Sequence, residues 1–192
     1  PLDNVKVTGR QGSQPVLSLS EPVDVQSTKL RVETRGEGRE IIEDSPVLVS
    51  LTAFDGDTGT NLNPDGSANL ILGSASETDL GPLLSALLVG VNEGSRLVVA
   101  RPLEDGSTEI DVIDVLYTIA KGEPNADPSG PLSVSFSADG PIVSHAKGDP
   151  PSDLVVQVLN FGSGAQVKPE DVVVVQYLAG TWAGARLVGS TW

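Results

Sequence analysis

Short apolar segments rich in Val, Leu, Ile and Thr recur along most of the chain, and Gly, Pro, Asp and Ser separate them. Runs of this length, bounded by turn-forming residues, predict β-strands. The expected strands are Val5–Thr8, Leu30–Thr34, Val47–Phe54, Asn69–Leu72, Arg96–Arg101, Ile110–Ile119, Val134–Ser137, Leu154–Asn160 and Val172–Leu178.

One segment has helical periodicity. The leucines that recur at the spacing of one helix face are Leu80, Leu83, Leu84, Leu87 and Leu88. We expect Thr78 or Asp79 to cap the N-terminus, Pro82 to lie in the first turn and Gly90 to end the helix. One short helix among many strands predicts the α+β class, with the leucine face packed on a sheet.

The chain contains one arrangement twice. The segments RGEGREIIEDSPVLV and FGSGAQVKPEDVVVV both run from a Gly-x-Gly through an acidic turn into an apolar stretch. Gly36 lies 126 residues before Gly162, and Leu51 lies 126 residues before Tyr177. A period of roughly 120–130 residues indicates a repeated domain, not a solenoid of 20–50 residues.

The residues ahead of each copy also match. LDNVKVTGRQGSQPVL aligns with LSVSFSADGPIV, which places Val5 opposite Val134 and Val16 opposite Ile142. We therefore place a first domain at residues 1–120 and the first half of a second copy at residues 132–192. Residues 121–131 contain three prolines and two glycines without apolar periodicity, which predicts a linker.

Composition limits the partners. The chain carries a formal net charge of −14, and its 12 Lys plus Arg form no cluster. Phosphate binding needs a basic surface, so neither nucleic acid nor an anionic membrane surface is an expected partner. The sequence contains no cysteine, which excludes disulfides. It begins with Pro1 and contains no methionine, so we expect a processed or cut N-terminus, with a removed lipid anchor as the only link to a membrane.

The order of motifs resembles the FKBP-type peptidyl-prolyl isomerases. In the first domain these motifs are Gly-x-Gly, an acidic turn, VLVSL, the pair Leu62-Asn63, NLILG, a leucine helix and GVNEGSRLVVARP. The second copy, VKPEDVVVVQYLAGTWAGARLVGSTW, resembles the entry to another such domain. The resemblance is to the tandem form of secreted or lipid-anchored actinobacterial proteins, and it rests on the order and repetition of the motifs.

This resemblance implies an α+β fold in which a twisted antiparallel sheet wraps around one short helix, followed by the β-rich first half of a second copy. It also implies catalysis of rotation about the Xaa–Pro amide, which has a barrier of ~20 kcal/mol. Such catalysis needs an apolar cup that binds the twisted amide preferentially, with no metal and no small-molecule cofactor. The implied partners are proline-containing polypeptides, and the implied location is extracellular or in the cell envelope.

In the first domain the family's pocket positions fall largely on aliphatic residues. The family tyrosine falls on Leu51, the Phe-Asp pair falls on Leu62 and Asn63, and the helix-borne positions fall near Leu80 and Leu84. The implied substrate cleft is apolar but lacks aromatic walls and polar groups. We therefore expect little or no isomerase activity in this domain.

In the second copy Tyr177 matches the family tyrosine and Leu187 stands at the phenylalanine position, so the resemblance makes these two the catalytic candidates. The copy has no counterpart of the leucine helix, and a half-domain cannot bury its valine run alone. We expect either that the chain continues beyond Trp192 or that these strands pair with another copy. Three functions stay open: a prolyl isomerase of the cell envelope, a non-catalytic FKBP-like binding or chaperone module, and a purely structural domain of a surface protein with its cleft filled.

Three other patterns favour structural roles. The segment Asp55–Gly66 is rich in oxygen ligands but lacks the glycine and glutamate of a calcium-binding loop, so it predicts a polar connection. His145 lies in a Ser-, Pro- and Gly-rich stretch and is interpreted as a solvated loop histidine. The two Gly-x-Gly motifs are not followed by helices, which favours tight turns or bulges over phosphate loops.

Overall fold

The structure is a computed structural model that describes residues 2–119, 121–137, 140–145, 148–164, 166–169, 171, 173–183 and 186–192. The chain divides into two compact units, Pro1–Thr118 (unit 1) and Ile119–Trp192 (unit 2). The predicted linker at residues 121–131 contains the short strand β8 (Gly122–Pro124) and belongs to unit 2.

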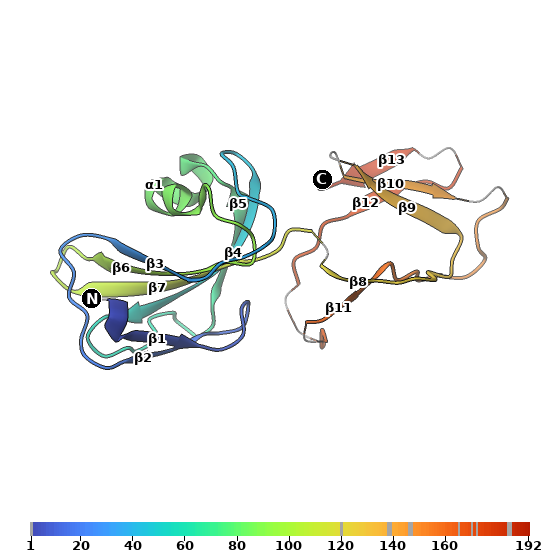
Figure 1. The fold of residues 1–192 in the computed structure, drawn as a ribbon. Coiled ribbons are helices and arrows are strands. Elements are labelled where there is room, and N and C mark those ends of the chain that lie inside the picture. The colour runs from blue at the N-terminus through green and yellow to red at the C-terminus, as the bar shows by residue number, and fades with distance from the viewer. Residues whose placement is uncertain are drawn as a thin grey trace. The chain divides into compact units, whose positions relative to one another are not determined.

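The centre of unit 1 is a five-stranded antiparallel sheet with the order β3-β6-β7-β4-β5 (Figure 1). β6 and β7 are buried over nearly their whole length, because strands lie beside them in the sheet and other elements cover both faces. The strands of this sheet are β3 (Lys29–Thr34), β4 (Pro46–Asp55), β5 (Asn69–Ser74), β6 (Arg96–Pro102) and β7 (Thr108–Val115). They confirm the strands predicted for this region, although β7 ends before the predicted Ile119.

Different elements cover the two faces of this sheet (Figure 1). The helix α1 (Glu77–Leu88) packs on one face and encloses the helix-side core, whose buried residues are Ile41, Val47, Val49, Ala75, Leu88, Leu97, Val99, Ile113 and Val115. The 3-10 turn η1 (Leu2–Asn4) and the hairpin of β1 (Val5–Thr8) and β2 (Val16–Leu19) cover the other face. They enclose the hairpin-side core, formed by Leu2, Val5, Leu17, Val23, Val25, Phe54, Val98, Ala100, Ile110 and Val112.

The N-cap of the helix lies two or three residues earlier than the predicted caps. The Ser76 hydroxyl accepts a hydrogen bond from the backbone N–H of Asp79 (3.3 Å), so Ser76 is the N-cap in place of the predicted Thr78 or Asp79. Gly81 has φ +76° and interrupts the helix, and Pro82 follows this break. The helix ends at Leu88, before Gly90 (φ +85°), as the sequence predicted.

The predicted α+β class is wrong. The described residues form thirteen strands but only one α-helix and one 3-10 turn, so the protein is mainly β. The physical reason is that a β-hairpin, not a helix, covers the second face of the unit 1 sheet. The sheet therefore lies between a helix and a hairpin and does not wrap around the helix alone.

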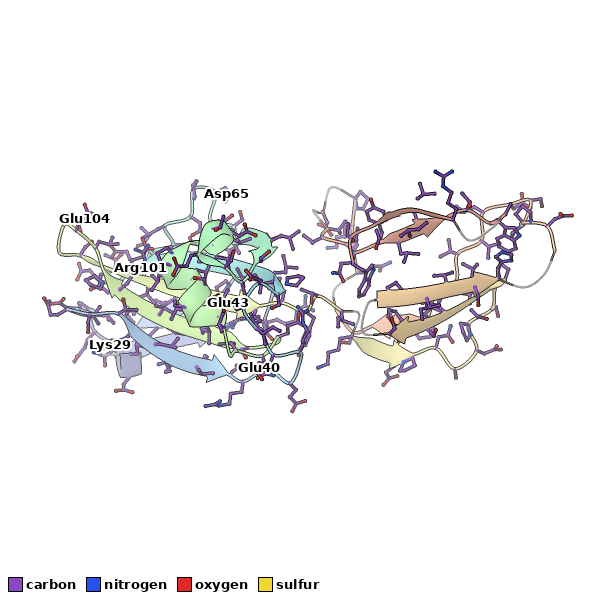
Figure 2. All side chains as sticks on the ribbon, turned by 90° about the horizontal axis from the view of Figure 1, so that it is seen from above. Lys29, Glu40, Glu43, Asp65, Arg101 and Glu104 are labelled. Carbon is purple, nitrogen blue, oxygen red and sulfur yellow. The ribbon has the colours of Figure 1, made fainter. Side chains whose placement is uncertain are left out.

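Two clusters of charged residues fasten β6 to β7 and to its surroundings. Arg96 and Asp114 form a buried pair (Nε–Oδ1 2.6 Å), and the Arg96 Nη1 donates to the carbonyl of Gly9 (2.8 Å). Arg101 lies near the end of the sheet where β6 turns into β7, as Figure 2 shows, and it pairs with Glu109 and Asp111. Burial and the nearby Glu109 raise the pKa of Asp111 to about 6, against the opposing effect of Arg101.

The described residues of unit 2 form three two-stranded antiparallel pairs and no larger sheet. They are β8 with β11 (Asn160–Gly162), β9 (Leu132–Ser137) with β10 (Gly140–His145), and β12 (Leu178–Gly180) with β13 (Leu187–Ser190). The β9–β10 pair confirms the predicted strand at Val134–Ser137.

Two predicted strands of unit 2 are wrong for most of their length. Residues 154–159 and 173–177 have no strand conformation, although Asn160 and Leu178 begin β11 and β12; Val172 lies outside the described residues. The equivalent segments of unit 1, 126 residues earlier, fall on β3 and β4, which pair with β6, β7 and β5. Residues 154–159 and 173–177 lack such partners among the described residues, and a strand needs a neighbour for its backbone hydrogen bonds.

Backbone pairings recur at the predicted offset of 126 residues. The bridge between Phe54 and Asn61 in unit 1 corresponds to the pair Gly180 and Leu187 in unit 2. The hydrogen bond from Asp55 N–H to the Thr60 carbonyl (2.9 Å) corresponds to one from Thr181 N–H to the Arg186 carbonyl (3.0 Å). The β1–β2 and β9–β10 hairpins occupy matching positions as well.

Candidate functional site

Three of the predicted cleft residues of unit 1 lie together. Leu51 on β4 and Leu80 and Leu84 on α1 are half-buried and pack against the helix-side core. They form an apolar layer between helix and sheet. The contacts are those of an ordinary core, in which leucines contribute by removing apolar surface from water.

The other two predicted cleft residues have different surroundings. Leu62 is 46% exposed and is not among the residues packed against the helix-side core. The Asn63 side chain accepts from the backbone N–H of Ala53 (2.9 Å) and donates to the carbonyls of Leu51 (3.2 Å) and Ser67 (2.7 Å). Asn63 thus fastens the connection after β4 to the strand itself, which satisfies backbone groups near the end of the β4–β5 pairing.

The two catalytic candidates of unit 2 lie on one hairpin. The Tyr177 backbone exchanges hydrogen bonds with Thr191, through the Thr191 hydroxyl (2.9 Å) and the Thr191 N–H (3.0 Å). The Tyr177 ring lies over Gly189, where an added Cβ would be 3.3 Å from the phenolic oxygen. Leu187 pairs with Gly180 and lines a cavity, whereas Tyr177 is not among the lining residues.

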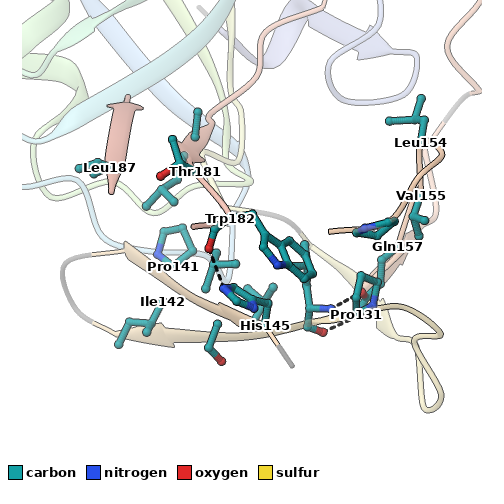
Figure 3. Close-up of a pocket in the computed structure, with 18 of the residues that line it drawn as sticks. Pro131, Pro141, Ile142, His145, Leu154, Val155, Gln157, Thr181, Trp182 and Leu187 are labelled. Carbon is teal, nitrogen blue, oxygen red and sulfur yellow. Dashed lines mark hydrogen bonds between the residues drawn. The ribbon is translucent and has the colours of Figure 1, made fainter. Parts of the chain in front are cut away.

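This cavity has a volume of about 780 Å³ and lies entirely within unit 2. Its walls come from the β9–β10 hairpin, residues 151–157 and the β12–β13 region. In Figure 3, Leu154 and Val155 lie on one side of it, and Thr181 and Leu187 lie on another. Most of the lining is aliphatic, which is typical of a site that binds an apolar ligand.

One wall of the cavity is aromatic. The rings of Trp182 and His145 stack with centroids 4.1 Å apart and an interplanar angle of 21° (Figure 3). A hydrogen bond joins His145 Nε2 to the Trp182 carbonyl (2.9 Å), and the indole N–H donates to the Gly148 carbonyl (3.0 Å). These contacts orient the indole ring at the cavity wall.

The placement of His145 in a loop is wrong, because His145 ends β10 and stacks on Trp182, although its side chain is exposed, as the interpretation of a solvated histidine expected. The offset of 126 residues between the two motif copies in the sequence held a signal for this position. His145 lies 126 residues after Leu19, which packs against the hairpin-side core of unit 1. The offset thus matches a residue that packs on the core in unit 1 with a residue that lines the cavity in unit 2.

Gln157 holds the third wall of the cavity in place. Its side-chain amide donates to the carbonyls of Leu132 (2.9 Å) and Pro128 (3.3 Å) and accepts from the Leu132 N–H (3.2 Å). Gly130 lies so close to Gln157 that a Cβ added at Gly130 would be 2.1 Å from the Gln157 side-chain oxygen. Gln157 thus ties residues 151–157 to the start of β9.

The oxygen-rich segment that begins at Asp55 has a structural role. Asp55 accepts hydrogen bonds from the N–H groups of Asp57 (3.1 Å) and Thr58 (2.7 Å) in its own turn, and bonding to Thr58 lowers the Asp55 pKa. Within the described part of the chain, no three His, Asp or Glu side chains are grouped to hold a metal ion. None of the helices described there is long and apolar enough to span a membrane.

The glycines of the first Gly-x-Gly motif allow another segment to pack closely against them. Added Cβ atoms at Gly36 and Gly38 would lie 2.1 Å and 2.8 Å from the Glu93 carbonyl oxygen, so these glycines admit the turn at residues 93–95. Gly162 and Gly164 occupy the same positions in unit 2, and nothing lies within 4 Å of a Cβ added there. The second motif is thus open where the first is packed.

No model of a protein family matches this sequence, and no curated protein matches it. Two solved structures from Arabidopsis thaliana are similar to part of the chain. The N-terminal domain of FKBP42 has 10% identity and a TM-score of 0.36, over 52% of this chain and 91% of that one. A multi-domain immunophilin has 11% identity and a TM-score of 0.35, over 62% of this chain and 51% of that one.

Both neighbours are FKBP or immunophilin proteins. The present chain spans about half the length of the multi-domain immunophilin. A likeness at these TM-scores by itself assigns neither a fold nor a function.

Proposed function

We propose that the protein is an FKBP-like polypeptide-binding module, and that the unit 2 cavity takes a proline-containing apolar stretch of polypeptide. The observation that carries the proposal is the cavity of about 780 Å³ with the stacked Trp182 and His145 in its wall. An aromatic face and aliphatic walls suit a proline ring, which is compact and apolar. The FKBP-like part of the proposal is supported by the order of the motifs in the sequence.

We further propose that the two units are tandem copies of one plan. The recurrence of the Phe54–Asn61 bridge as the Gly180–Leu187 pair supports this, as does the matching placement of two hairpins. The extracellular or cell-envelope location belongs to the same proposal and has the motif resemblance as its support.

Catalysis of Xaa–Pro isomerisation is the second candidate. Leu187, which stands at a family pocket position, lines the cavity, and Tyr177 immediately precedes β12. Catalysis requires the cavity to bind the twisted amide more tightly than the planar one. The structure of unit 1 adds no support for activity there, because Leu51, Leu80 and Leu84 pack as core.

A titration with the peptides Ala-Leu-Pro-Phe and Ala-Leu-Ala-Phe tests the binding proposal. The protein contains two tryptophans, so a Trp192→Phe variant leaves Trp182 as the sole indole reporter. We expect the proline peptide to change Trp182 fluorescence at lower concentration than the alanine peptide does. Calorimetry should show binding lost in Trp182→Ala and kept in Trp192→Ala, since Trp192 lies outside the cavity lining. Equal binding of both peptides would reject the proposal.

Magnetisation-exchange NMR on Ala-Leu-Pro-Phe tests isomerisation without a coupled protease. Faster cis–trans exchange in the presence of the protein, reduced by Leu187→Ala, would support the second candidate. An unchanged exchange rate, with binding intact, would leave a binding module that is not an isomerase.

A further inference from the structure

The cavity of unit 2 corresponds to a filled core in unit 1. Four of the ten buried residues of the hairpin-side core come from β6 and β7, namely Val98, Ala100, Ile110 and Val112. In the sheet order, β6 and β7 lie between β3 and β4. The core on this face therefore depends on a hairpin inserted between two other strands.

Five of the six remaining buried positions of that core, and the partly buried Leu19, have equivalents around the cavity; the sixth, Val23, corresponds to Asp149, which lies outside the lining. The offset is 129 residues for η1 and β1, where Val5 aligns with Val134, and 126 residues further along the chain. The core positions Leu2, Val5, Leu17, Leu19, Val25 and Phe54 correspond to Pro131, Val134, Val143, His145, Pro151 and Gly180, all of which line the cavity. The cavity thus occupies the place that the side chains of β6 and β7 fill in unit 1.

Most of the backbone beside the cavity lies outside any strand ladder, although the carbonyls of Leu159 and Tyr177 accept from the N–H groups of Asn125 and Thr191. Residues 154–159 and 173–177, which correspond to parts of β3 and β4, have no strand partner in the described structure. Their valines are exposed, and Val175 is 68% exposed although its equivalent Val49 is fully buried. Gly162 and Gly164 leave open the space into which the turn before β6 packs in unit 1.

We infer that unit 2 binds a partner β-hairpin with the pattern of β6 and β7, which inserts between residues 154–159 and 173–177 and fills the cavity with alternate apolar side chains. This inference rests on the proposal that the cavity binds polypeptide, and it names the ligand as a two-stranded segment. Backbone ladders on both sides supply affinity, and the alternating side chains supply specificity. Unit 1 has this arrangement within its own chain, because its β6–β7 hairpin pairs with β3 through β6 and with β4 through β7.

The probe is a synthetic peptide with the sequence of residues 95–116, SRLVVARPLEDGSTEIDVIDVL. The control peptide carries Val98→Ser, Ala100→Ser, Ile110→Thr and Val112→Thr, which keep the length and the turn but remove the four core side chains. Both peptides lack tryptophan, so the fluorescence of the 192-residue protein reports binding at unit 2, which holds both tryptophans.

We expect saturable binding of the probe and slower hydrogen exchange, by about tenfold or more, at the amides of residues 154–159 and 173–177. The control peptide should not bind. In the protein, Val143→Asp should abolish probe binding by placing a carboxylate in the cavity wall. Val167→Asp is the matched control, because Val167 is exposed and lies outside the lining, and it should leave binding unchanged.

Two results would overturn the inference: no slowing of exchange in these two segments, or equal binding of probe and control peptides. The proline peptides separate this failure from that of the proposed function. If Ala-Leu-Pro-Phe binds and the probe does not, the cavity is a polypeptide site for single extended segments, and the hairpin inference is wrong. If neither binds, both proposals fail.

Discussion

β4 of unit 1 and the segment 126 residues later in unit 2 have similar apolar patterns and opposite outcomes. Val49 lies on a ten-residue strand and is fully buried, whereas Val175 belongs to a stretch without strand conformation and is 68% exposed. β4 has a partner on each side, β7 and β5. The comparison teaches that a valine run becomes a central strand only where neighbours complete its hydrogen bonds and cover its side chains.

The two Gly-x-Gly motifs teach the same lesson about packing. Gly36 and Gly38 touch the turn at residues 93–95, which leads into β6. Gly162 and Gly164 have the same spacing but no neighbour at the corresponding place. Glycine permits close approach in both units, and only unit 1 uses it.

The largest expected effect comes from breaking the ion pair that anchors β6 to β7. Asp114→Ala leaves Arg96 buried without its carboxylate and removes an acceptor for the Gly12 N–H (2.8 Å). We expect the free energy of unfolding of unit 1 to fall by about 3–5 kcal/mol. Urea unfolding followed by far-UV circular dichroism measures this loss. Tryptophan fluorescence, which reports unit 2, should show an unshifted transition; a parallel shift would mean that the two units unfold together.

A matched pair of valine variants tests the comparison directly. Val49→Ala should lower the free energy of unfolding by about 2–3 kcal/mol, because it opens a cavity in the helix-side core. Val175→Ala should change it by less than about 0.5 kcal/mol, since that side chain is already exposed. Denaturant midpoints of both variants measure the two losses of stability. Equal losses would show that the valine run of unit 2 is buried in solution.

A matched pair of glycine variants tests the packing difference. Gly36→Ala should destabilise the protein by about 1–3 kcal/mol, because its Cβ meets the Glu93 carbonyl at 2.1 Å. Gly162→Ala meets nothing within 4 Å and should be neutral or slightly stabilising, by up to about 1 kcal/mol. Thermal unfolding of the two variants measures the contrast. A cost at Gly162 close to that at Gly36 would contradict the open packing of unit 2.

The smallest expected effect is the pH dependence that Asp111 adds to unit 1. Its pKa is raised to about 6 by burial first and by Glu109 second, so the folded state holds this proton more tightly than the unfolded chain does. The resulting stabilisation is fully present below the ordinary pKa of aspartate, near 4, and is lost as the pH rises through about 6. We expect the loss to be about 1–2 kcal/mol.

Unfolding experiments on the protein and on Asp111→Asn between pH 4 and pH 7 measure this contribution. The variant should lose less stability than the parent over this interval, because its amide does not titrate. Identical slopes would exclude Asp111 as the source. Arg101 keeps Glu109 as a partner in the variant, so the ion pair at the end of the sheet persists.

Particular elements show how much of the fold could be predicted from the sequence. The alternation of apolar residues located all five strands of the unit 1 sheet, and the leucine spacing located α1. The same reasoning placed strands at residues 154–160 and 172–178, where the structure has only their last residues in β11 and β12. The helix cap was misplaced because Ser76 lies before the apolar pattern begins, and its role depends on its contact with Asp79.

The candidate site was less predictable than the fold. Leu187 was selected from a motif and does line the cavity, but the Trp182–His145 stack joins residues 37 positions apart that share no motif. Asn63 was selected as a cleft residue, and its hydrogen bonds instead fasten a turn to β4. Polar contacts of this kind depend on distances that periodicity does not encode.

The sequence by itself determined where apolar segments begin and end, which segment is helical, and that one arrangement of glycines and valines occurs twice. The tertiary structure decided which of these segments are strands, which face each core occupies, and that unit 2 encloses a cavity where unit 1 has a core. The reason is physical: side-chain pattern is local to a segment, whereas the hydrogen bonds and the covering side chains of a strand come from partners far away in the chain.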